Sequence, residues 1–116
     1  MHELSVCQGL LKQVGQIAAE HQATTVEKIY LQIGPLAGVE PALLQAAFPT
    51  ARINTLAAQA DIVIKTMPIR VKCKTCHEES EATANNLTCV ACGDWQTELL
   101  SGDELLIESI DMQTAQ

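Results

Sequence analysis

The chain has 116 residues, of which 47% are hydrophobic and only 3% aromatic, and its formal net charge at pH 7 is −7. This length permits one modest hydrophobic core, or one core with a small accessory module. The negative charge argues against duplex nucleic acid as the main partner, because phosphate binding relies on an excess of Lys and Arg. No apolar run approaches the ~18 residues that a membrane helix needs, and we expect no signal peptide because no basic segment precedes an apolar one.

The first predicted elements are a helix and a strand. Residues 4–22 are predicted to form an amphipathic helix, because apolar side chains recur there at helical spacing. Gly9 and Gly15 each weaken this helix by ~1 kcal/mol relative to Ala, so packing must stabilise it. Residues 26–33 alternate between polar and apolar side chains, which indicates a strand that ends at Gly34.

The following elements complete a small α+β fold. A short second helix is predicted from Pro41 to Phe48, because Pro is favoured in a first turn and Pro49 bounds the segment. Residues 50–60 are predicted to be a loop. Residues 61–67 are rich in β-branched side chains and are predicted to form a strand, and residues 104–112 are predicted to form a third one. We therefore expect a small three-stranded sheet with two helices on one face.

Four of the five cysteines form two Cys-x-x-Cys pairs, with residues 77–88 between them. A loop at each pair lets two thiolates turn toward one ion, and Zn²⁺ is the usual occupant of such a tetrahedral S₄ site. Iron is an alternative ion, and a redox dithiol is an alternative role, although neither pair opens a helix after a strand. The sequence predicts a structural zinc site with ligands Cys73, Cys76, Cys89 and Cys92.

The metal motif occupies residues 69–101, between two predicted strands, so it forms an insertion with two connections to the rest of the chain. A module of ~30 residues buries too little apolar surface to fold unaided, and its metal should supply most of its stability. Trp95 is expected to cover this module. Cysteines that serve as metal ligands suit a reducing compartment, so a cytoplasmic location is expected.

The beginning of the chain offers a second set of metal donors. The α-amine of Met1 and the amide and imidazole nitrogens of His2 can close two chelate rings, and Glu3 can add its amide nitrogen or its carboxylate. Nitrogen-rich planar sites favour Ni²⁺ or Cu²⁺ over Zn²⁺. The first amides of a helix have no intrahelical acceptor, so ligation there breaks no helix bond. A solvated His2 side chain is the alternative.

Two further side chains near these sites have simpler interpretations. Cys7 lies on the apolar stripe of the first helix, where it is interpreted as a small buried hydrophobe. A redox or metal role for Cys7 stays open because it is close in sequence to the N-terminal donors. His77 adjoins Cys76, and an exposed side chain is favoured over a metal ligand.

Several motifs occur together and in order along the whole chain. They are residues 1–8 (MHELSVCQ), residues 31–40 (LQIGPLAGVE), the two cysteine pairs and residues 101–105 (SGDEL). In this combination the chain resembles the HypA/HybF family, the nickel-insertion accessory proteins of [NiFe]-hydrogenase maturation.

The resemblance implies a nickel-binding α/β domain formed by residues 1–68 and 103–116, with an inserted Cys₄ zinc domain at residues 69–102. It implies Ni²⁺ ligation centred on His2, with backbone nitrogens of His2 and Glu3 contributing. It also implies a metallochaperone without enzymatic activity, which delivers Ni²⁺ to the hydrogenase large subunit together with the nickel-binding GTPase HypB. Service to urease and formation of a homodimer stay open.

The alternative function is a zinc-ribbon module that binds nucleic acid or transcription machinery. Its basic residues, Arg70, Lys72 and Lys74, are outnumbered by acidic ones, and one aromatic side chain is present for stacking on bases. The acidic residues of residues 69–101 are Glu78, Glu79, Glu81, Asp94 and Glu98. This balance is unsuited to a phosphate backbone, so the metallochaperone is preferred.

Overall fold

A computed structural model describes residues 2–114, with only the backbone described at residue 2, and the chain separates into two compact units. Unit 1 contains the segments up to Leu31, from Val39 to Lys65 and from Leu106 onward. Unit 2 contains Gln32–Gly38 and Thr66–Leu105. The helices and strands confirm the predicted α+β class, whereas the limits of the two domains stay a prediction.

Unit 1 begins with helix α1, which spans His2–Glu20. Its buried side chains recur every three or four positions, as one apolar stripe requires, and they are Cys7, Leu11, Val14 and Ala18. The helix starts and ends about two residues earlier than the sequence predicts. The chain leaves the helical path at Gln22, whose φ of 57° lies in the left-handed region.

Helix α2 spans Pro41–Ala51, so the predicted end at Phe48 is wrong. Pro49 lies inside the last turn, where its missing N–H costs the helix one hydrogen bond. The turn is nevertheless closed by the Arg52 amide, which donates to the carbonyl of Phe48 at 3.0 Å. Because Phe48 is also buried, packing of this turn outweighs the lost bond.

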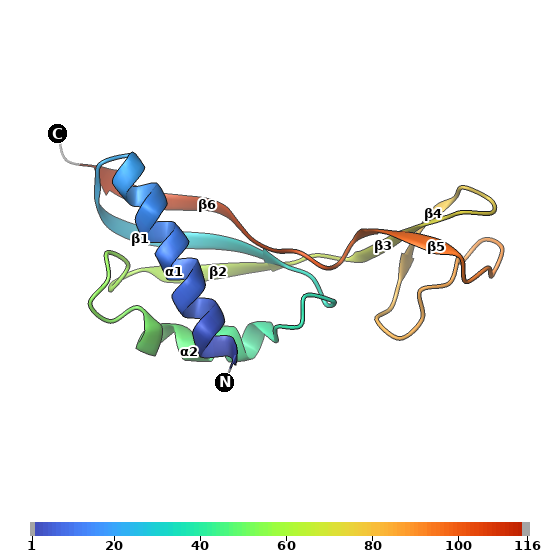
Figure 1. Ribbon diagram of the computed structural model, residues 1–116, viewed down its shortest axis with the longest axis horizontal. Helices are drawn as coiled ribbons and strands as arrows, with labels where there is room; N and C mark the ends of the chain where they lie inside the picture. Colours follow the sequence, from blue (N-terminus) through green and yellow to red (C-terminus); the bar gives the residue numbers. More distant parts are fainter. Residues whose placement is uncertain (1, 115–116) are drawn as a thin grey trace. The chain divides into compact units, whose positions relative to one another are not determined.

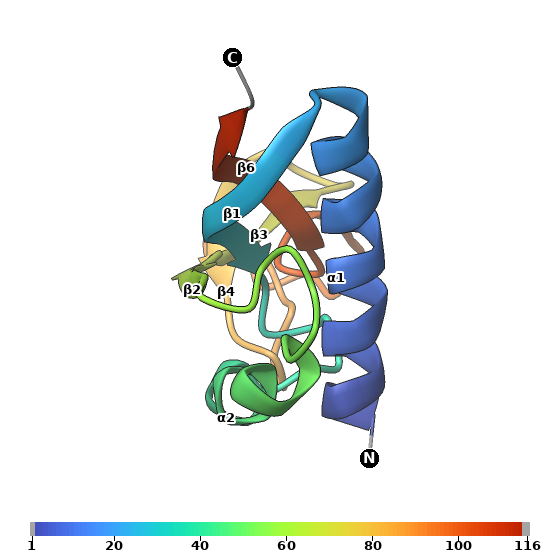
Figure 2. The ribbon, with the colours of Figure 1, turned by 90° about the vertical axis from the view of Figure 1, so that its left-hand side faces the viewer.

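The sheet of unit 1 has the strand order β2-β1-β6. Strand β1 spans Ala23–Ile33, β2 spans Asp61–Thr66 and β6 spans Leu105–Thr114. Figure 1 shows β1 and β2 running in the same direction and β6 in the opposite one. Figure 2 shows α1 and α2 on the same side of this sheet, as predicted. Ile29 and Leu31 of β1 and Ile62 of β2 are buried with them.

Unit 2 has its own three-stranded sheet, with the order β4-β3-β5 and antiparallel pairing throughout. Strand β3 spans Ile69–Cys73, β4 spans Glu79–Ala82 and β5 spans Thr97–Ser101. On β3 every second residue is buried, namely Ile69, Val71 and Cys73. One face of β3 therefore carries both the small interior of the unit and the first cysteine.

A close backbone contact within unit 2 joins the loop after β1 to the chain that follows β5. The amide of Gly34 donates to the carbonyl of Glu104 at 2.9 Å, and that of Leu36 donates to the carbonyl of Gly102 at 2.7 Å. A Cβ atom added to Gly34 would lie 2.1 Å from the carbonyl oxygen of Gly102. Only glycine permits this close approach of the two backbones. Gly34 therefore has a packing role in addition to ending the strand.

Candidate metal centre

Each cysteine pair lies in a tight turn with the same backbone hydrogen bonds. In the first knuckle (residues 73–78), the amide of Cys73 donates to the carbonyl of Glu78 at 2.9 Å, and that of His77 donates to the carbonyl of Cys73 at 3.0 Å. The first cysteine therefore closes its turn from both sides.

The second knuckle (residues 89–94) repeats this pattern. The amide of Cys89 donates to the carbonyl of Asp94, and that of Gly93 donates to the carbonyl of Cys89, both at 2.9 Å. The residue after each second cysteine has a left-handed backbone, with φ of 66° at His77 and 79° at Gly93. The two knuckles are thus two copies of one backbone turn, with His77 at the left-handed position of the first and Gly93 at that of the second.

Backbone amides also point at the first sulfur of each pair. The amides of Thr75 and Cys76 approach the Cys73 Sγ at 3.3 Å and 3.4 Å, and the amide of Cys92 approaches the Cys89 Sγ at 3.5 Å. Such N–H donors favour the charged form of a thiol, which is the form that ligates metal.

The knuckles bring all four sulfur atoms together. The four Sγ atoms lie within 4.8 Å of one another, and two pairs that cross between the knuckles, Cys73–Cys92 and Cys76–Cys89, are each 3.6 Å apart. Four thiolates at a Zn–S distance of about 2.3 Å in a tetrahedron would be about 3.8 Å apart. The donor set and its spacing therefore fit a four-coordinate thiolate site for an ion such as Zn²⁺.

The environment of the thiols differs within each pair. Cys73 and Cys89 are buried, whereas Cys76 and Cys92 are exposed. The hydrogen bond from the Cys76 amide is the main cause that lowers the pKa of Cys73 from 9.0 to about 6. The backbone of Asp94 lowers the pKa of Cys92, but the neighbouring thiols, Cys73 first, raise it to about 12. Four thiolates repel one another, and a divalent cation offsets that repulsion.

The predicted N-terminal site falls largely outside the described residues. Met1 and the side chain of His2 are not described, so the nickel donors stay a prediction. The backbone of His2 begins α1 and Glu3 lies in its first turn. Among residues 3–114, the side chains grouped closely enough to share an ion are the four cysteines, and Glu3 is not among them.

Three other side chains singled out in the sequence have different outcomes, and His77 is exposed, as expected. Cys7 is 1% exposed and its thiol donates to the carbonyl of Leu44 at 3.5 Å, and burial raises its pKa, which confirms the interpretation as a small buried residue. Trp95 is 75% exposed, so the expectation that it covers the zinc module is wrong. Its backbone is bonded, because the amide of Thr97 donates to its carbonyl at 3.0 Å, but the indole stays in solvent.

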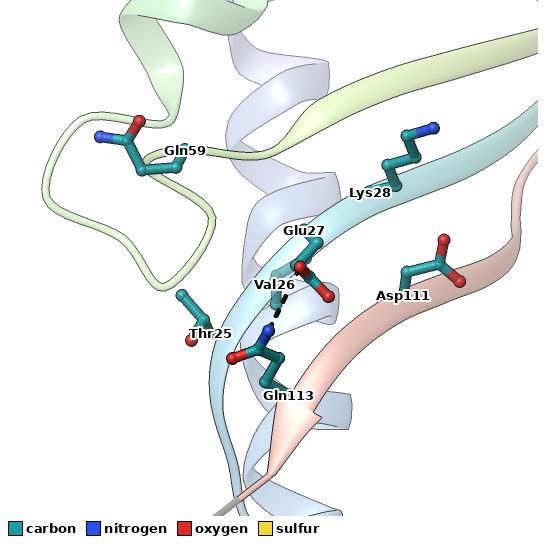
Figure 3. Close-up of a pocket in the computed structure, with 7 residues that line it drawn as sticks. All are labelled: Thr25, Val26, Glu27, Lys28, Gln59, Asp111 and Gln113. Carbon is teal, nitrogen blue, oxygen red and sulfur yellow. Dashed lines mark hydrogen bonds between the residues drawn. The ribbon is translucent and has the colours of Figure 1, made fainter.

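A recess of about 500 Å³ lies in unit 1, between β1, β6 and the loop before β2. Figure 3 shows Glu27, Lys28, Asp111 and Gln113 around it, with the Gln113 Nε2 donating to the Glu27 Oε2 at 3.4 Å. Sequence reasoning missed this recess, because its residues come from three separate segments and form no motif. It mixes both signs of charge and presents no grouped metal ligands.

The fold and the centre define a small two-unit α+β protein with a four-cysteine metal site. A model of the family described as "Hydrogenase/urease nickel incorporation, metallochaperone, hypA" matches residues 1–112. The chain therefore belongs to the HypA family of nickel metallochaperones that serve hydrogenase maturation, a family without enzymatic activity. The expected family and the absence of an enzymatic role are confirmed.

Relatives named as hydrogenase maturation factors match nearly the whole chain. A hydrogenase maturation factor HypA from Nitrosospira multiformis is 44% identical over 114 residues, which cover 98% of this chain and 99% of that protein. The protein of the same name from Aquifex aeolicus is 36% identical and the match covers 97% of this chain and 98% of that one.

Solved structures agree with the fold. A HypA solution structure has a TM-score of 0.74 at 26% identity, covering 99% of this chain and 98% of its own. The Ni metallochaperone HypA from Helicobacter pylori has a TM-score of 0.72 at 24% identity, covering 97% and 98%, and supports the fold alone. Within the described residues, no helix is both long and apolar enough to cross a bilayer.

Proposed function

We propose that the chain binds Ni²⁺ at its N-terminus and delivers it to the [NiFe]-hydrogenase large subunit. The imidazole of His2 is the central ligand, and backbone nitrogens of His2 and Glu3 complete the set. Membership of the HypA family over residues 1–112 is the observation that carries this proposal. Delivery proceeds in the cytoplasm with HypB, a GTPase, as the partner in the transfer.

The start of α1 supports this ligand set. The helix begins at His2, so the amides of residues 2 and 3 lie in its first turn, where no intrahelical acceptor exists. Nitrogen donors in a plane favour Ni²⁺ over Zn²⁺. A site at a chain end leaves one side of the ion accessible to an acceptor protein. An imidazole titrates near pH ~6.5, so acidification releases the ion by protonating its ligand.

The experiment is equilibrium Ni²⁺ binding to the untagged protein and to His2→Ala, followed by dialysis and elemental analysis. His21→Ala is the matched control, because His21 is exposed just beyond the other end of α1. We expect His2→Ala to lose at least tenfold in affinity and His21→Ala to bind as the wild type does. If both variants bind equally, the nickel site is misplaced.

A second arm separates the ligands from one another. One additional residue before Met1 moves the α-amine and leaves the imidazole and the amides in place. Weaker Ni²⁺ binding by this extended form would show that the α-amine is a ligand. Unchanged binding would exclude the α-amine from the ligand set and leave the other proposed donors in it. Transfer is then measured from the loaded protein to the large subunit, with and without HypB and GTP. A failure of transfer with intact binding would reject the delivery step alone.

We also propose that Zn²⁺ occupies the four-cysteine centre as a structural ion. The support is the spacing of the sulfurs, with two crossing pairs at 3.6 Å, and the N–H donors around them. Elemental analysis of the purified protein should give one zinc per chain. Cys89→Ser should lower this value strongly, whereas Cys7→Ser should leave it unchanged.

A further inference from the structure

The two knuckles are connected by a side-chain hydrogen bond as well as by their sulfurs. Thr75 lies inside the first knuckle, between its two cysteines, and its hydroxyl donates to the Oδ2 of Asp94 in the second knuckle. The other carboxylate oxygen, Oδ1, accepts the amide of Gln96 at 3.0 Å. Both carboxylate oxygens of Asp94 therefore accept a hydrogen bond, one from Thr75 in the first knuckle and one from the Gln96 amide just after the second. These two bonds hold the carboxylate in one orientation.

The backbone reinforces the same connection. The amide of Lys74 donates to the carbonyl of Gln96 at 2.9 Å, so the first knuckle is bonded to the segment that holds the Asp94 carboxylate. The carbonyl of Asp94 accepts the amide of Cys89 at 2.9 Å and closes the second knuckle. Because these are backbone bonds, replacing the side chain of Asp94 leaves them in place.

Asp94 is not a fifth ligand. The group of side chains that can share an ion contains the four cysteines and no carboxylate among the described residues. The hydrogen bond that Asp94 accepts from Thr75 instead joins the two knuckles whose sulfur atoms pair across the centre, as Cys73–Cys92 and Cys76–Cys89. Groups that orient ligands in this way contribute substantially to metal affinity.

We propose that the Thr75–Asp94 bridge positions the two knuckles for metal and slows its loss, so that Asp94 is a positioning residue of the centre. The inference rests on the proposed zinc occupancy and is independent of the nickel site. A hydrogen bond to a carboxylate is charge-assisted and stronger than one between neutral groups. In the folded unit the bridge holds the two knuckles together, so it opposes the separation of the sulfur atoms through which the ion would be lost.

The test measures Zn²⁺ affinity and the rate of Zn²⁺ transfer to a chromogenic chelator, using the full chain. Asp94→Ala should weaken binding about tenfold and speed transfer by a similar factor, at the lower end of the effect typical of groups that orient ligands. The control is Asp103→Ala, which removes an exposed carboxylate from the same unit and should behave as the wild type. Equal values for the two variants would overturn the proposal.

A second pair of variants separates positioning from general damage. Thr75→Val removes the hydroxyl at constant shape and should weaken binding about as much as Asp94→Ala, whereas Thr75→Ser should restore it. The double variant Thr75→Val/Asp94→Ala should be no weaker than either single one, because both remove the same bond. Additive losses, or no rescue by Ser, would reject the bridge.

Two further measurements distinguish a failure of the proposed bridge from a failure of the zinc assignment on which it rests. Zinc content of the wild type tests the zinc assignment itself, and a wild type without zinc rejects that assignment rather than the bridge. With Co²⁺ as a probe, the thiolate spectrum should keep its shape in Asp94→Ala while its affinity falls. A changed spectral shape would show that the ligand set itself has altered and would count against a positioning role.

Discussion

The two units bury different materials. Unit 1 encloses a continuous apolar interior between two helices and a sheet, with Val14, Leu31 and Leu44 at 2% exposure or less. Unit 2 buries Ile33, Ile69 and Val71 together with two cysteines of the metal centre. A long buried stripe stabilises the first unit without an ion, whereas so few apolar residues cannot offset the chain entropy of the second. The thiol cluster with its ion therefore serves as the larger part of the core of unit 2.

The largest effect that tests this difference is removal of the ion. Extraction by a strong chelator, or Cys89→Ser, should unfold residues 66–105 and leave unit 1 folded, because binding energy on the order of 10 kcal/mol is also folding energy in such modules. Amide hydrogen exchange should rise at Val71 and stay slow at Leu31. Trp95 fluorescence is a poor reporter, since the indole is already 75% exposed.

The fifth cysteine provides the control for that experiment. Cys7→Ala removes a buried thiol from unit 1 and should change neither metal content nor exchange at Val71. If extraction of the ion accelerates amide exchange at Val71 and Leu31 together, the two units share one folding transition. That result would reject the claim that unit 1 is stable without the ion.

A second change acts on the apolar interior alone. Leu44→Ala leaves a cavity at a site that is 0% exposed, and should cost about 2–5 kcal/mol of unfolding free energy in unit 1. Leu43→Ala on the same helix, where the side chain is 53% exposed, should cost under about 0.5 kcal/mol. Thermal unfolding with zinc analysis checks both, and zinc loss on unfolding of unit 1 would argue against separate cores.

The features of the fold and of the metal centre that the sequence could predict are those that arise from residues close together in the chain. The stripe of α1 and the cysteine spacing were predictable, because each follows from positions close in the chain. Strands β4 and β5 were not, since Glu79–Ala82 and Thr97–Ser101 carry weak alternation and become strands only by pairing with β3. The contact of Gly34 with Gly102 and the Thr75–Asp94 bridge were beyond reach, because each joins segments that no motif connects.

The third change tests the glycine contact inside unit 2. Gly34→Ala would place a Cβ 2.1 Å from the Gly102 carbonyl oxygen, so the backbone must move and weaken the bonds at Gly34 and Leu36. We expect a loss of about 1–3 kcal/mol, as overpacking typically costs, seen as faster exchange of these two amides.

Gly9→Ala is the matched control and should have the opposite sign. Nothing lies within 4 Å of the added Cβ in α1, so the variant should stabilise that helix by up to ~1 kcal/mol. A neutral Gly34→Ala would show that the loop adjusts freely, and the requirement for glycine at this contact would be rejected.

The smallest change compares the two knuckles themselves. They share one backbone turn, yet His77 has a Cβ in the left-handed region and Gly93 has none. His77→Gly should therefore stabilise unit 2 by about 0.5 kcal/mol, and Gly93→Ala should destabilise it by about 1 kcal/mol, even though nothing lies within 4 Å of the added Cβ. The measurement is the zinc-dependent unfolding midpoint of each variant.

His77→Ala keeps the strain and removes the imidazole, so it should match the wild type. If His77→Ala instead weakens metal retention, the imidazole contributes to the centre, and the two knuckles differ in chemistry as well as in strain.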